Sequence, residues 1–268
     1  MRLVPLIILI TNILPMILAG SAVGQITNSV STSEPLNIKT IESTIRILTY
    51  NVRNCVGMDR KTDYDRVAAI ISAIHPNVVA LQELDSVTAR SKGVNVLKVL
   101  AEKCGMNFTY GASIPYSGGK YGIGILSTEK PVSTSFISLP GSEEKRGLLM
   151  AEFKNYILFC THFSLTEADR VASVKLINQK VNEPHKRIFL AGDLNASPAS
   201  EAIISLTDYW INLSGIQPTF PSSDPKQCID YIWGLNCCNF RYNIIKQEVV
   251  SEKTASDHRP VFVDVSFE

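Results

Sequence analysis

The sequence has almost no excess charge of either sign. Its 268 residues include 26 Lys and Arg against 25 Asp and Glu, so the formal net charge at pH 7 is +1. Nonspecific binding to nucleic acid depends on positive charge that neutralises phosphates, so the charge of the whole chain does not predict it. A basic patch confined to one surface stays open. With 45% hydrophobic and 19% charged residues, the composition is globular, and the length suits one large domain or two small ones.

The sequence also lacks the cysteine and histidine spacings of zinc sites, an internal repeat, and a low-complexity tract beyond the linker described next. Its six cysteines are Cys55, Cys104, Cys160, Cys228, Cys237 and Cys238. We expect mostly buried free thiols with at most one disulfide, whose pairing cannot be deduced from the spacing.

The N-terminus has the organisation of an export signal. Arg2 precedes an apolar run over 3–18, and small residues over 19–24 provide a signal-peptidase site before Gln25. An uncleaved membrane anchor is the alternative, but the run is short for a spanning helix and is interrupted by prolines. The expected organisation is a signal peptide over 1–24, a linker over 25–44 and one domain over 45–268. The mature protein is expected to be secreted or periplasmic.

Hydrophobic periodicity predicts strands and helices in close succession. Helical spacing is found over 63–74, 93–104, 165–181 and 198–206. Strands are predicted over 45–52, 78–81, 107–111, 121–127, 132–139, 147–153, 156–162, 186–192, 228–234, 240–250 and 261–267. Helices near both ends of this order, with many hairpin-linked strands between them, favour two packed sheets flanked by helices.

Polar side chains recur where the predicted buried strands begin or end. They are Asn51, Glu83, His162, Asp193, Asn195, Asp230, Asp257 and His258. A carboxylate among apolar residues is unfavourable unless it is paired or binds a metal. One such residue alone is more simply a helix cap or a satisfied hydrogen bond in the core. Their recurrence at the same kind of position indicates one site, held by the sheet and exposed by the loops.

The chemistry of these side chains suits metal-assisted hydrolysis. The candidate ligands carry oxygen and therefore favour Mg²⁺, or Mn²⁺, over zinc. A metal at Glu83 can polarise a phosphoryl oxygen, and Asp193 can orient or deprotonate a water molecule. Asp230 can hold His258 in one tautomer and stabilise its charged form, while His162 can donate to a phosphate oxygen.

The motifs, in their order along the chain, resemble the endonuclease/exonuclease/phosphatase superfamily. They are Thr49-Tyr-Asn51, Leu81-Gln-Glu83, Tyr121-Gly122 with Ile125-Leu-Ser127, Thr161-His162, Gly192-Asp-Leu-Asn195, Ile229-Asp-Tyr231 and Ser256-Asp-His258. The superfamily includes DNase I, abasic-site endonucleases, inositol polyphosphate phosphatases and neutral sphingomyelinases. The resemblance runs from about Ile45 to Phe267. It implies a DNase I-like α+β fold, a four-layer α/β/β/α sandwich of two mainly antiparallel sheets flanked by helices, and Mg²⁺-dependent phosphoester hydrolysis.

The resemblance also implies roles for residues around a metal. Asn51, Glu83 and Asp257 would surround the ion, and Asp193 and Asn195 would position the water and the scissile phosphate.

Further roles are implied for residues that contact the phosphate. His162 would bind it directly, and His258, supported by Asp230, would stabilise the pentacovalent state or transfer a proton. Tyr121 matches an active-site tyrosine. Arg146 would bind a substrate phosphate bidentately, with an ordinary surface arginine as the alternative.

The stretch from Asn51 to Asp65 resembles the small exported and bacterial hydrolases of the superfamily. A glycan at the formal sequon of Asn195 would block the site, so either the sequon is inaccessible or the source is a cell without that pathway, and a bacterial source is favoured. Two departures concern the substrate: Arg53 stands where some nucleases carry an acidic residue, and Ile123-Gly124 replaces a more polar pair.

We therefore expect an exported Mg²⁺-dependent phosphoesterase acting on phosphodiester or phosphomonoester bonds. A DNA endonuclease and an inactive binding module of the same fold are the alternatives. The expected partner is a phosphoester substrate, either a phospholipid, an inositol phosphate, a nucleotide or nucleic acid. No protein partner is implied, and a monomer is expected.

Overall fold

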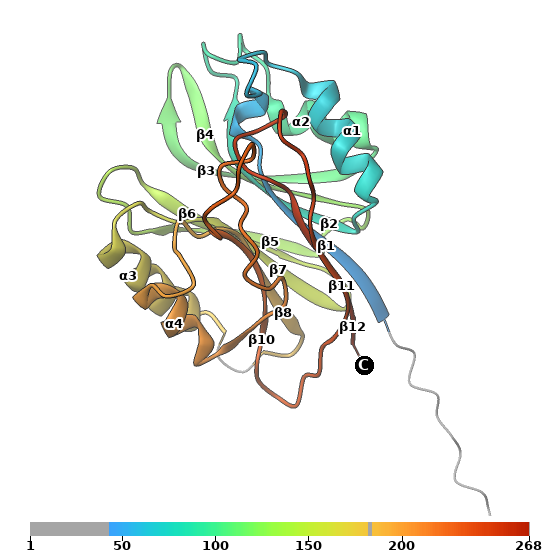
Figure 1. Ribbon diagram of the computed structural model, residues 1–268, viewed down its shortest axis with the longest axis vertical. Coiled ribbons are helices and arrows are strands. Elements are labelled where there is room, and N and C mark those ends of the chain that lie inside the picture. Colours follow the sequence, from blue (N-terminus) through green and yellow to red (C-terminus); the bar gives the residue numbers. More distant parts are fainter. Residues whose placement is uncertain (1–42, 182–183, 268) are drawn as a thin grey trace, which may run out of the picture. The chain divides into compact units, whose positions relative to one another are not determined.

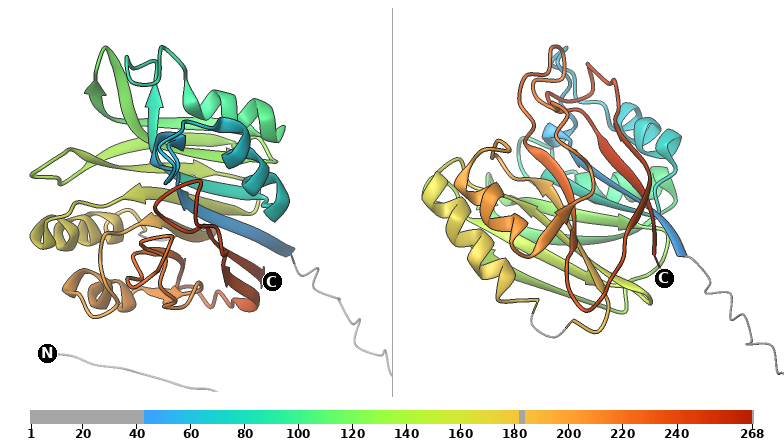
Figure 2. Two further views of the ribbon diagram at one scale, coloured as in Figure 1. Left: turned by 45° about the horizontal axis from the view of Figure 1, so that its top comes forward. Right: turned by 60° about the horizontal axis from the view of Figure 1, so that its bottom comes forward.

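Two six-stranded sheets face each other in the computed structural model, which describes residues 43–181 and 184–267 (Figure 1). Helices α1 and α2 lie on the outer side of one sheet, and α3 and α4 on the outer side of the other, as the further views also show (Figure 2). The predicted four-layer α/β/β/α sandwich of the α+β class is thus confirmed. The predicted signal peptide and all but the end of the predicted linker lie outside the described residues.

The first sheet has the strand order β11-β12-β1-β2-β4-β3. Its strands are β1 (Ser43–Asn51), β2 (Val78–Ser86), β3 (Asn107–Tyr116), β4 (Gly119–Ser127), β11 (Asn243–Val249) and β12 (Val261–Phe267). Strands β1 and β2 are parallel, because α1 (Tyr64–Ile74) carries the chain back between them. The other neighbours are antiparallel, and α2 (Val96–Cys104) follows β2.

The second sheet repeats this plan, with the order β5-β6-β7-β8-β10-β9. Its strands are β5 (Ser133–Leu139), β6 (Arg146–Glu152), β7 (Tyr156–His162), β8 (Arg187–Asp193), β9 (Trp210–Asn212) and β10 (Asp230–Leu235). Here β7 and β8 are the parallel pair, joined through α3 (Glu167–Asn178), and α4 (Glu201–Thr207) follows β8. Each sheet therefore has a parallel pair near its centre. Within each pair, the carboxyl ends of the two strands lie at the same edge of the sheet.

Local sequence explains where the first helices begin and end. The Asp63 carboxylate accepts the Arg66 backbone N–H at the start of α1, and Asn95 does the same for Lys98 at the start of α2. Gly105 ends α2 in the left-handed conformation. The caps place the start of α2 three residues after the predicted position.

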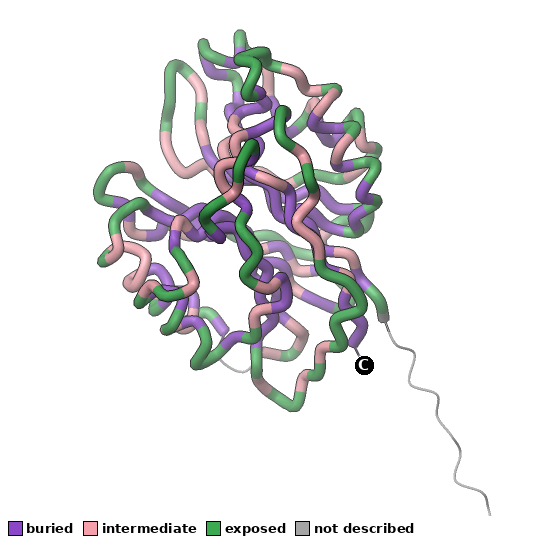
Figure 3. Tube along the Cα trace, in the orientation of Figure 1, coloured by how far each residue is buried: buried purple, intermediate pink, exposed green. Residues whose placement is uncertain are grey.

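Three hydrophobic cores hold the four layers together. The central core lies between the sheets and includes Ile47, Phe189 and Val263. One outer core packs the first sheet against α1 and α2, and the other packs the second sheet against α3 and α4. Burial is accordingly concentrated in the strands, and exposure in the loops and on the outer helix surfaces (Figure 3).

The six cysteines are all free thiols in the described residues, so no disulfide crosses the layers. Cys55, Cys160 and Cys228 are buried, one in each of the three cores. Burial raises the pKa of Cys160 to about 12, which keeps it as an unreactive thiol. No helix within the described part of the chain is both long and apolar enough to span a membrane.

Several other elements also differ from the predicted ones. β1 begins at Ser43, so the last two residues of the predicted linker belong to the strand. The short strand β9 and a 3₁₀ turn over Arg53–Cys55 were not predicted. β2 does not end at Glu83 but continues to Ser86, because a bulge between Leu81 and Leu84 lets the strand absorb one residue and resume pairing.

Replacing Phe189 with alanine is expected to lower the free energy of unfolding by about 3–5 kcal/mol. The Phe189 ring is fully buried in the central core, with the rings of Tyr156, Tyr242 and Phe267 at centroid distances of 6.1, 5.6 and 5.9 Å. Urea denaturation measures the change. Val132→Ala is the control, because Val132 is 69% exposed and its loss should change stability by less than about 0.5 kcal/mol. Equal losses in the two variants would contradict the packing described here.

Candidate active site

Three ionisable residues form a row across the second sheet. His162 at the end of β7 lies opposite Asp193 at the end of β8, and Asp193 lies opposite Asp230 at the start of β10. Residues directly opposite each other on neighbouring strands present their side chains to the same face. All three are buried. Register alone therefore brings together residues that are distant in the sequence.

The first sheet contributes Asn51 and Glu83 from adjacent strands. Asn51 ends β1, and Glu83 is the extra residue of the β2 bulge, with a φ of 60°. A positive φ is uncommon for a residue with a side chain and is found most often where function requires it. The bulge aims the Glu83 carboxylate at Asn51, whose Nδ2 donates to Glu83 Oε1 at 2.9 Å. Nothing in the sequence around Glu83 signals this bulge.

Asp193 is the meeting point of the two sheets. Its Oδ2 accepts a hydrogen bond from Asn51 Nδ2 at 3.1 Å. The Nε2 atoms of His162 and His258 lie 3.5 and 3.6 Å from the same oxygen. The other oxygen, Oδ1, accepts the backbone N–H of Asn195 at 2.9 Å. One buried carboxylate is thus surrounded by an amide and two imidazoles on one side and by a backbone donor on the other.

Asn195 is held in the left-handed conformation beside Asp193, with a φ of 47°. Its Nδ2 donates to the backbone carbonyl of Phe163 at 3.0 Å, which ties the loop after β8 to the loop after β7. Asparagine tolerates this conformation better than most residues. The residue is half-buried, so its side chain lies at the edge of the site.

His258 is locked against Asp230. Its Nδ1 lies 2.9 Å from Asp230 Oδ2 and 3.2 Å from Oδ1, and Thr219 donates its hydroxyl to Oδ2 at 2.5 Å. Burial by itself lowers the pKa of His258, but the charges of Asp230 and Asp193 outweigh it and raise the pKa to about 10. His258 is therefore an imidazolium at neutral pH. Thr219 was not among the predicted site residues, because its loop carries no pattern that marks it.

His162 differs from His258 in its charge. Burial lowers its pKa to about 4, the charge of Asp193 opposes this, and nearby Arg146 lowers it further. At neutral pH the ring is uncharged, and one nitrogen donates while the other accepts. Two imidazoles next to one carboxylate thus differ in charge because of what lies behind each of them, which is typical of paired acid and neutral donor groups in active sites.

Asp257 lies at the open side of the site and is 26% exposed. The pKa of Glu83 is raised by burial, lowered by the hydrogen bond from Asn51, and raised again by the charges of Asp193 and Asp257. Glu83 and Asp257 are therefore near enough to interact. Arg53 Nε lies 3.5 Å from Asp257 Oδ2, so a cation occupies the position where some nucleases have a carboxylate.

Arg146 is buried, with 6% of its surface exposed, so it is not an ordinary surface arginine. Its Nη2 and Nη1 contact Glu143 and Glu144 at 3.0 and 3.2 Å. Because the guanidinium already has these two carboxylates, phosphate binding by Arg146 stays a prediction. Tyr121 lies at the same edge, where burial and the charges of Glu83 and Glu144 raise its pKa.

Two donor sets in this site suit a metal ion. The ligand atoms of Asp193, Asp230 and His258 all lie within 4.8 Å of one another and could hold one. When His258 is protonated, however, neither of its nitrogens has a lone pair to offer. The second set is the predicted one of Asn51, Glu83 and Asp257, in which oxygen ligands suit Mg²⁺.

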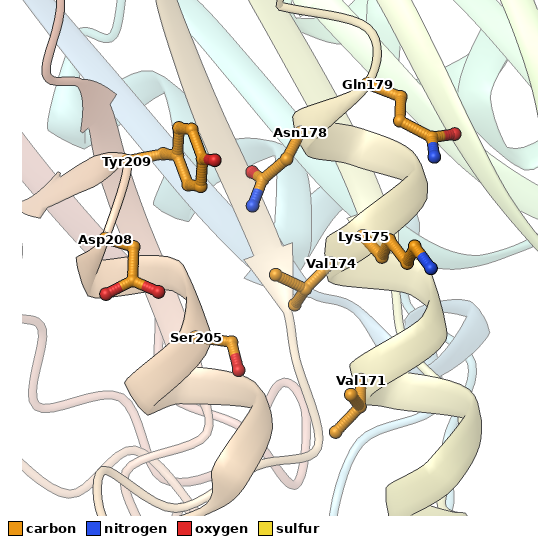
Figure 4. A pocket seen from close by; sticks show the side chains of 8 residues that line it. All are labelled: Val171, Val174, Lys175, Asn178, Gln179, Ser205, Asp208 and Tyr209. Carbon is orange, nitrogen blue, oxygen red and sulfur yellow. The ribbon is translucent and has the colours of Figure 1, made fainter.

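A groove of about 420 Å³ elsewhere on the molecule does not compete with this site. It opens between α3 and α4 (Figure 4). Its lining side chains are Val171, Val174, Lys175, Asn178, Gln179, Ser205, Asp208 and Tyr209. The volume suits a small ligand, but the groove has no cluster of acidic and imidazole groups that could carry hydrolysis.

Comparison with known proteins assigns this geometry to a family. The model of the Endonuclease/Exonuclease/phosphatase family matches residues 48–258. None of the curated proteins matches the sequence significantly. Solved structures of the same fold include an endonuclease/exonuclease/phosphatase from Bacteroides vulgatus, 20% identical with a TM-score of 0.71 over 84% of this chain and 100% of that one.

Two further solved structures are similar. One is an endonuclease/exonuclease/phosphatase from Beutenbergia cavernae, 22% identical with a TM-score of 0.69 over 84% of this chain and 72% of that one. The other is a mannosyl-6-phosphatase from Bacteroides thetaiotaomicron, 18% identical with a TM-score of 0.63 over 82% of this chain and 99% of that one. At these identities the likeness establishes the fold.

Replacing Asp230 with asparagine is expected to lower the pKa of His258, because the larger of its two stabilising carboxylate charges is removed. The raised pKa stabilises the fold fully below pH 6.5, the ordinary value, and this stabilisation is lost as the pH rises through about 10. The difference in unfolding free energy between wild type and Asp230→Asn should therefore shrink across that window. NMR titration of His258 and urea denaturation at each pH, both in EDTA, measure the two effects.

The exposed Asp224 provides the control for this charge change, since Asp224→Asn should leave the His258 titration unaltered. An unchanged His258 pKa in Asp230→Asn would show that the ion pair is not the cause of the shift.

Proposed function

Because the chain belongs to the endonuclease/exonuclease/phosphatase family, a family of phosphoesterase hydrolases, we propose that it is an exported, monomeric Mg²⁺-dependent phosphoesterase. It hydrolyses phosphodiester or phosphomonoester bonds by attack of a water molecule. The observation that carries this proposal is the convergence of Asn51, His162 and His258 on a single oxygen of the buried Asp193. A carboxylate in that setting can orient a water molecule and accept its proton.

The two imidazoles supply different parts of the reaction. His258, charged and fixed by Asp230, donates from Nε2, the nitrogen that faces Asp193, and stabilises negative charge on the phosphoryl group or protonates the leaving oxygen. His162, uncharged, donates a hydrogen bond to a phosphate oxygen without adding charge. His162 is held at the end of β7, and His258 is held by its contact with Asp230 at the start of β10, so little reorganisation is needed during the reaction.

A divalent ion fits the oxygen-rich side of the site. Glu83 and Asp257 would hold it, with Asn51 beside them. Burial first, and then the charges of Asp193 and Asp257, raise the pKa of Glu83, and a cation would stabilise such a carboxylate. Bound there, Mg²⁺ would polarise a phosphoryl oxygen and neutralise charge as it develops. Arg53 accompanies Asp257 at the open side and is suited to contact the substrate's phosphate.

The substrate is proposed to be a small phosphoester rather than long nucleic acid. The net charge of +1 gives no general attraction to a polyanion. One neighbour of similar fold is a mannosyl-6-phosphatase, which makes a sugar phosphate a reasonable member of a substrate panel. The panel should also contain a nucleotide, an inositol phosphate, sphingomyelin and double-stranded DNA, each with and without Mg²⁺.

Glu83→Gln is expected to lower Mg²⁺-dependent turnover on the panel by at least about 100-fold, because the amide removes a metal-binding charge from the site. Calorimetry should show a matching loss of Mg²⁺ affinity, whereas EDTA should abolish wild-type turnover. Glu102→Gln, on the exposed side of α2, is the matched control.

Cleavage of DNA alone would favour the endonuclease alternative, and a wild type with neither Mg²⁺ binding nor turnover would be a binding module. Loss of Mg²⁺ affinity in His258→Gln but not in Glu83→Gln would move the ion to the Asp193, Asp230 and His258 set.

Export is proposed from the N-terminal pattern of Arg2, the apolar run and the small residues before Gln25. Expression of the full chain in a bacterial host with intact secretion should yield a periplasmic or secreted protein. Its measured mass should be that of a chain beginning at Gln25. A full-length product retained in the cytoplasm or membrane would refute this.

A further inference from the structure

We propose that Arg90 is a positioning residue, which holds Tyr121 in place for the reaction proposed above and so rests on that function. Arg90 lies in the loop between β2 and α2, outside the motifs that mark the family resemblance. Its guanidinium forks onto Asp85, with Nε 2.9 Å from Oδ2 and Nη2 2.8 Å from Oδ1. A bidentate pair of this kind fixes the plane of the guanidinium as well as its position.

Asp85 is a rigid anchor for this pair. It is completely buried, it follows Glu83 by two residues on β2, and it accepts the hydroxyl of Thr88 at 2.8 Å. In the antiparallel pairing of β2 with β4, Asp85 lies directly opposite Tyr121. The same short stretch of β2 therefore carries a candidate metal ligand and the anchor of Arg90, and it borders the tyrosine.

The fixed guanidinium packs over two aromatic rings. The Arg90 Cζ atom lies 4.7 Å from the ring centroid of Tyr116 and 5.6 Å from that of Tyr121. The two rings are themselves 6.1 Å apart and tilted by 51°. Cation–π contacts within about 6 Å are attractive. Arg90 thus contacts the Tyr121 ring from the loop between β2 and α2.

Tyr121 connects this cluster to the site. Its hydroxyl is close enough to Glu83 and Glu144 for both charges to act on it, and to Arg146 and Arg90 for theirs to oppose them. Small displacements of a group that contacts the reacting phosphate reduce rates strongly. Without Arg90, the Tyr121 ring loses this cation–π contact, and its hydroxyl is held less firmly at one distance from the site.

A merely structural role for Arg90 is the competing explanation, and the chain contains a matched control for it. Arg46 forks onto Asp264 through Nε and Nη2 at 2.6 and 2.7 Å, and its Cζ atom lies 4.7 Å from the Phe262 ring. This is the same kind of cluster in the same sheet, five residues before Asn51 on β1. The Arg90 loop also keeps a backbone hydrogen bond from Ala89 to Ser117, so truncating Arg90 leaves the loop attached.

The test is a double-mutant cycle on kcat and KM for bis(p-nitrophenyl) phosphate with Mg²⁺. It compares wild type, Arg90→Ala, Tyr121→Phe, the double variant and Arg46→Ala. We expect Arg90→Ala to lower kcat by about 10-fold with KM changed by less than about twofold. In the Tyr121→Phe background the same change should lower kcat by less than about twofold, because the hydroxyl it positions is absent. Arg46→Ala should retain wild-type kcat.

Arg90→Lys adds a rescue measurement and serves if Arg90→Ala does not fold. Lysine keeps the charge but cannot make the planar fork, so its kcat should lie between those of wild type and Tyr121→Phe. The proposal is overturned by a full loss of kcat on top of Tyr121→Phe, by an equal loss in Arg46→Ala, by unchanged kcat in Arg90→Ala, or by an effect on KM alone. A wild type that hydrolyses no phosphoester overturns the proposed function and this inference with it.

Discussion

The buried carboxylate of Asp193 is the constraint on which the site depends. An ionised carboxylate with 1% exposure is very unfavourable unless donors replace its lost water. Its oxygens accept the Asn51 side-chain amide and the Asn195 backbone N–H, and the Nε2 atoms of His162 and His258 lie 3.5 and 3.6 Å from Oδ2. Each of these elements has to be in its native place for the charge to be satisfied. The fold and the site therefore stabilise each other through the two carboxylate oxygens of Asp193.

The position of Asp193 follows from how the sandwich is built. Each sheet contains one parallel pair, β1 with β2 and β7 with β8, and the carboxyl ends of these pairs carry the polar residues. The central core packs the two sheets face to face, which brings Asn51 from one sheet within hydrogen-bond distance of Asp193 on the other. Packing of apolar residues such as Phe189 thus sets distances in a polar site that they never touch.

The strands, the helices and the polar residues at strand ends that the structure brings together could be predicted from the sequence, because the signals are local. Periodicity marks the buried strands, and an acidic or amide residue at a strand end is visible without a structure. The arrangement between strands could not be predicted in the same way. The alignment of His162, Asp193 and Asp230 depends on register, the direction of Glu83 depends on a bulge, and the burial of Arg146 depends on two glutamates from a preceding turn. These are long-range properties, and the difference in charge between His162 and His258 follows from them.

The balance of charged side chains in the site also favours binding of a divalent ion. The carboxylates that meet here are those of Glu83, Asp193, Asp230 and Asp257, and the cations that face them are His258 and Arg53. Arg146 brings no excess positive charge to the site, because the two carboxylates of Glu143 and Glu144 pair with its single guanidinium. Among these six residues, four negative charges face two positive ones, so they carry two excess negative charges. An incoming phosphate is itself an anion, so the site would repel it on that balance. A divalent cation held by these carboxylates would offset the two excess negative charges, and it would favour the ionised form of Glu83 despite the burial that raises its pKa. The acidic surroundings of Asp193 thus suit a site that would hold a phosphoester together with a cation.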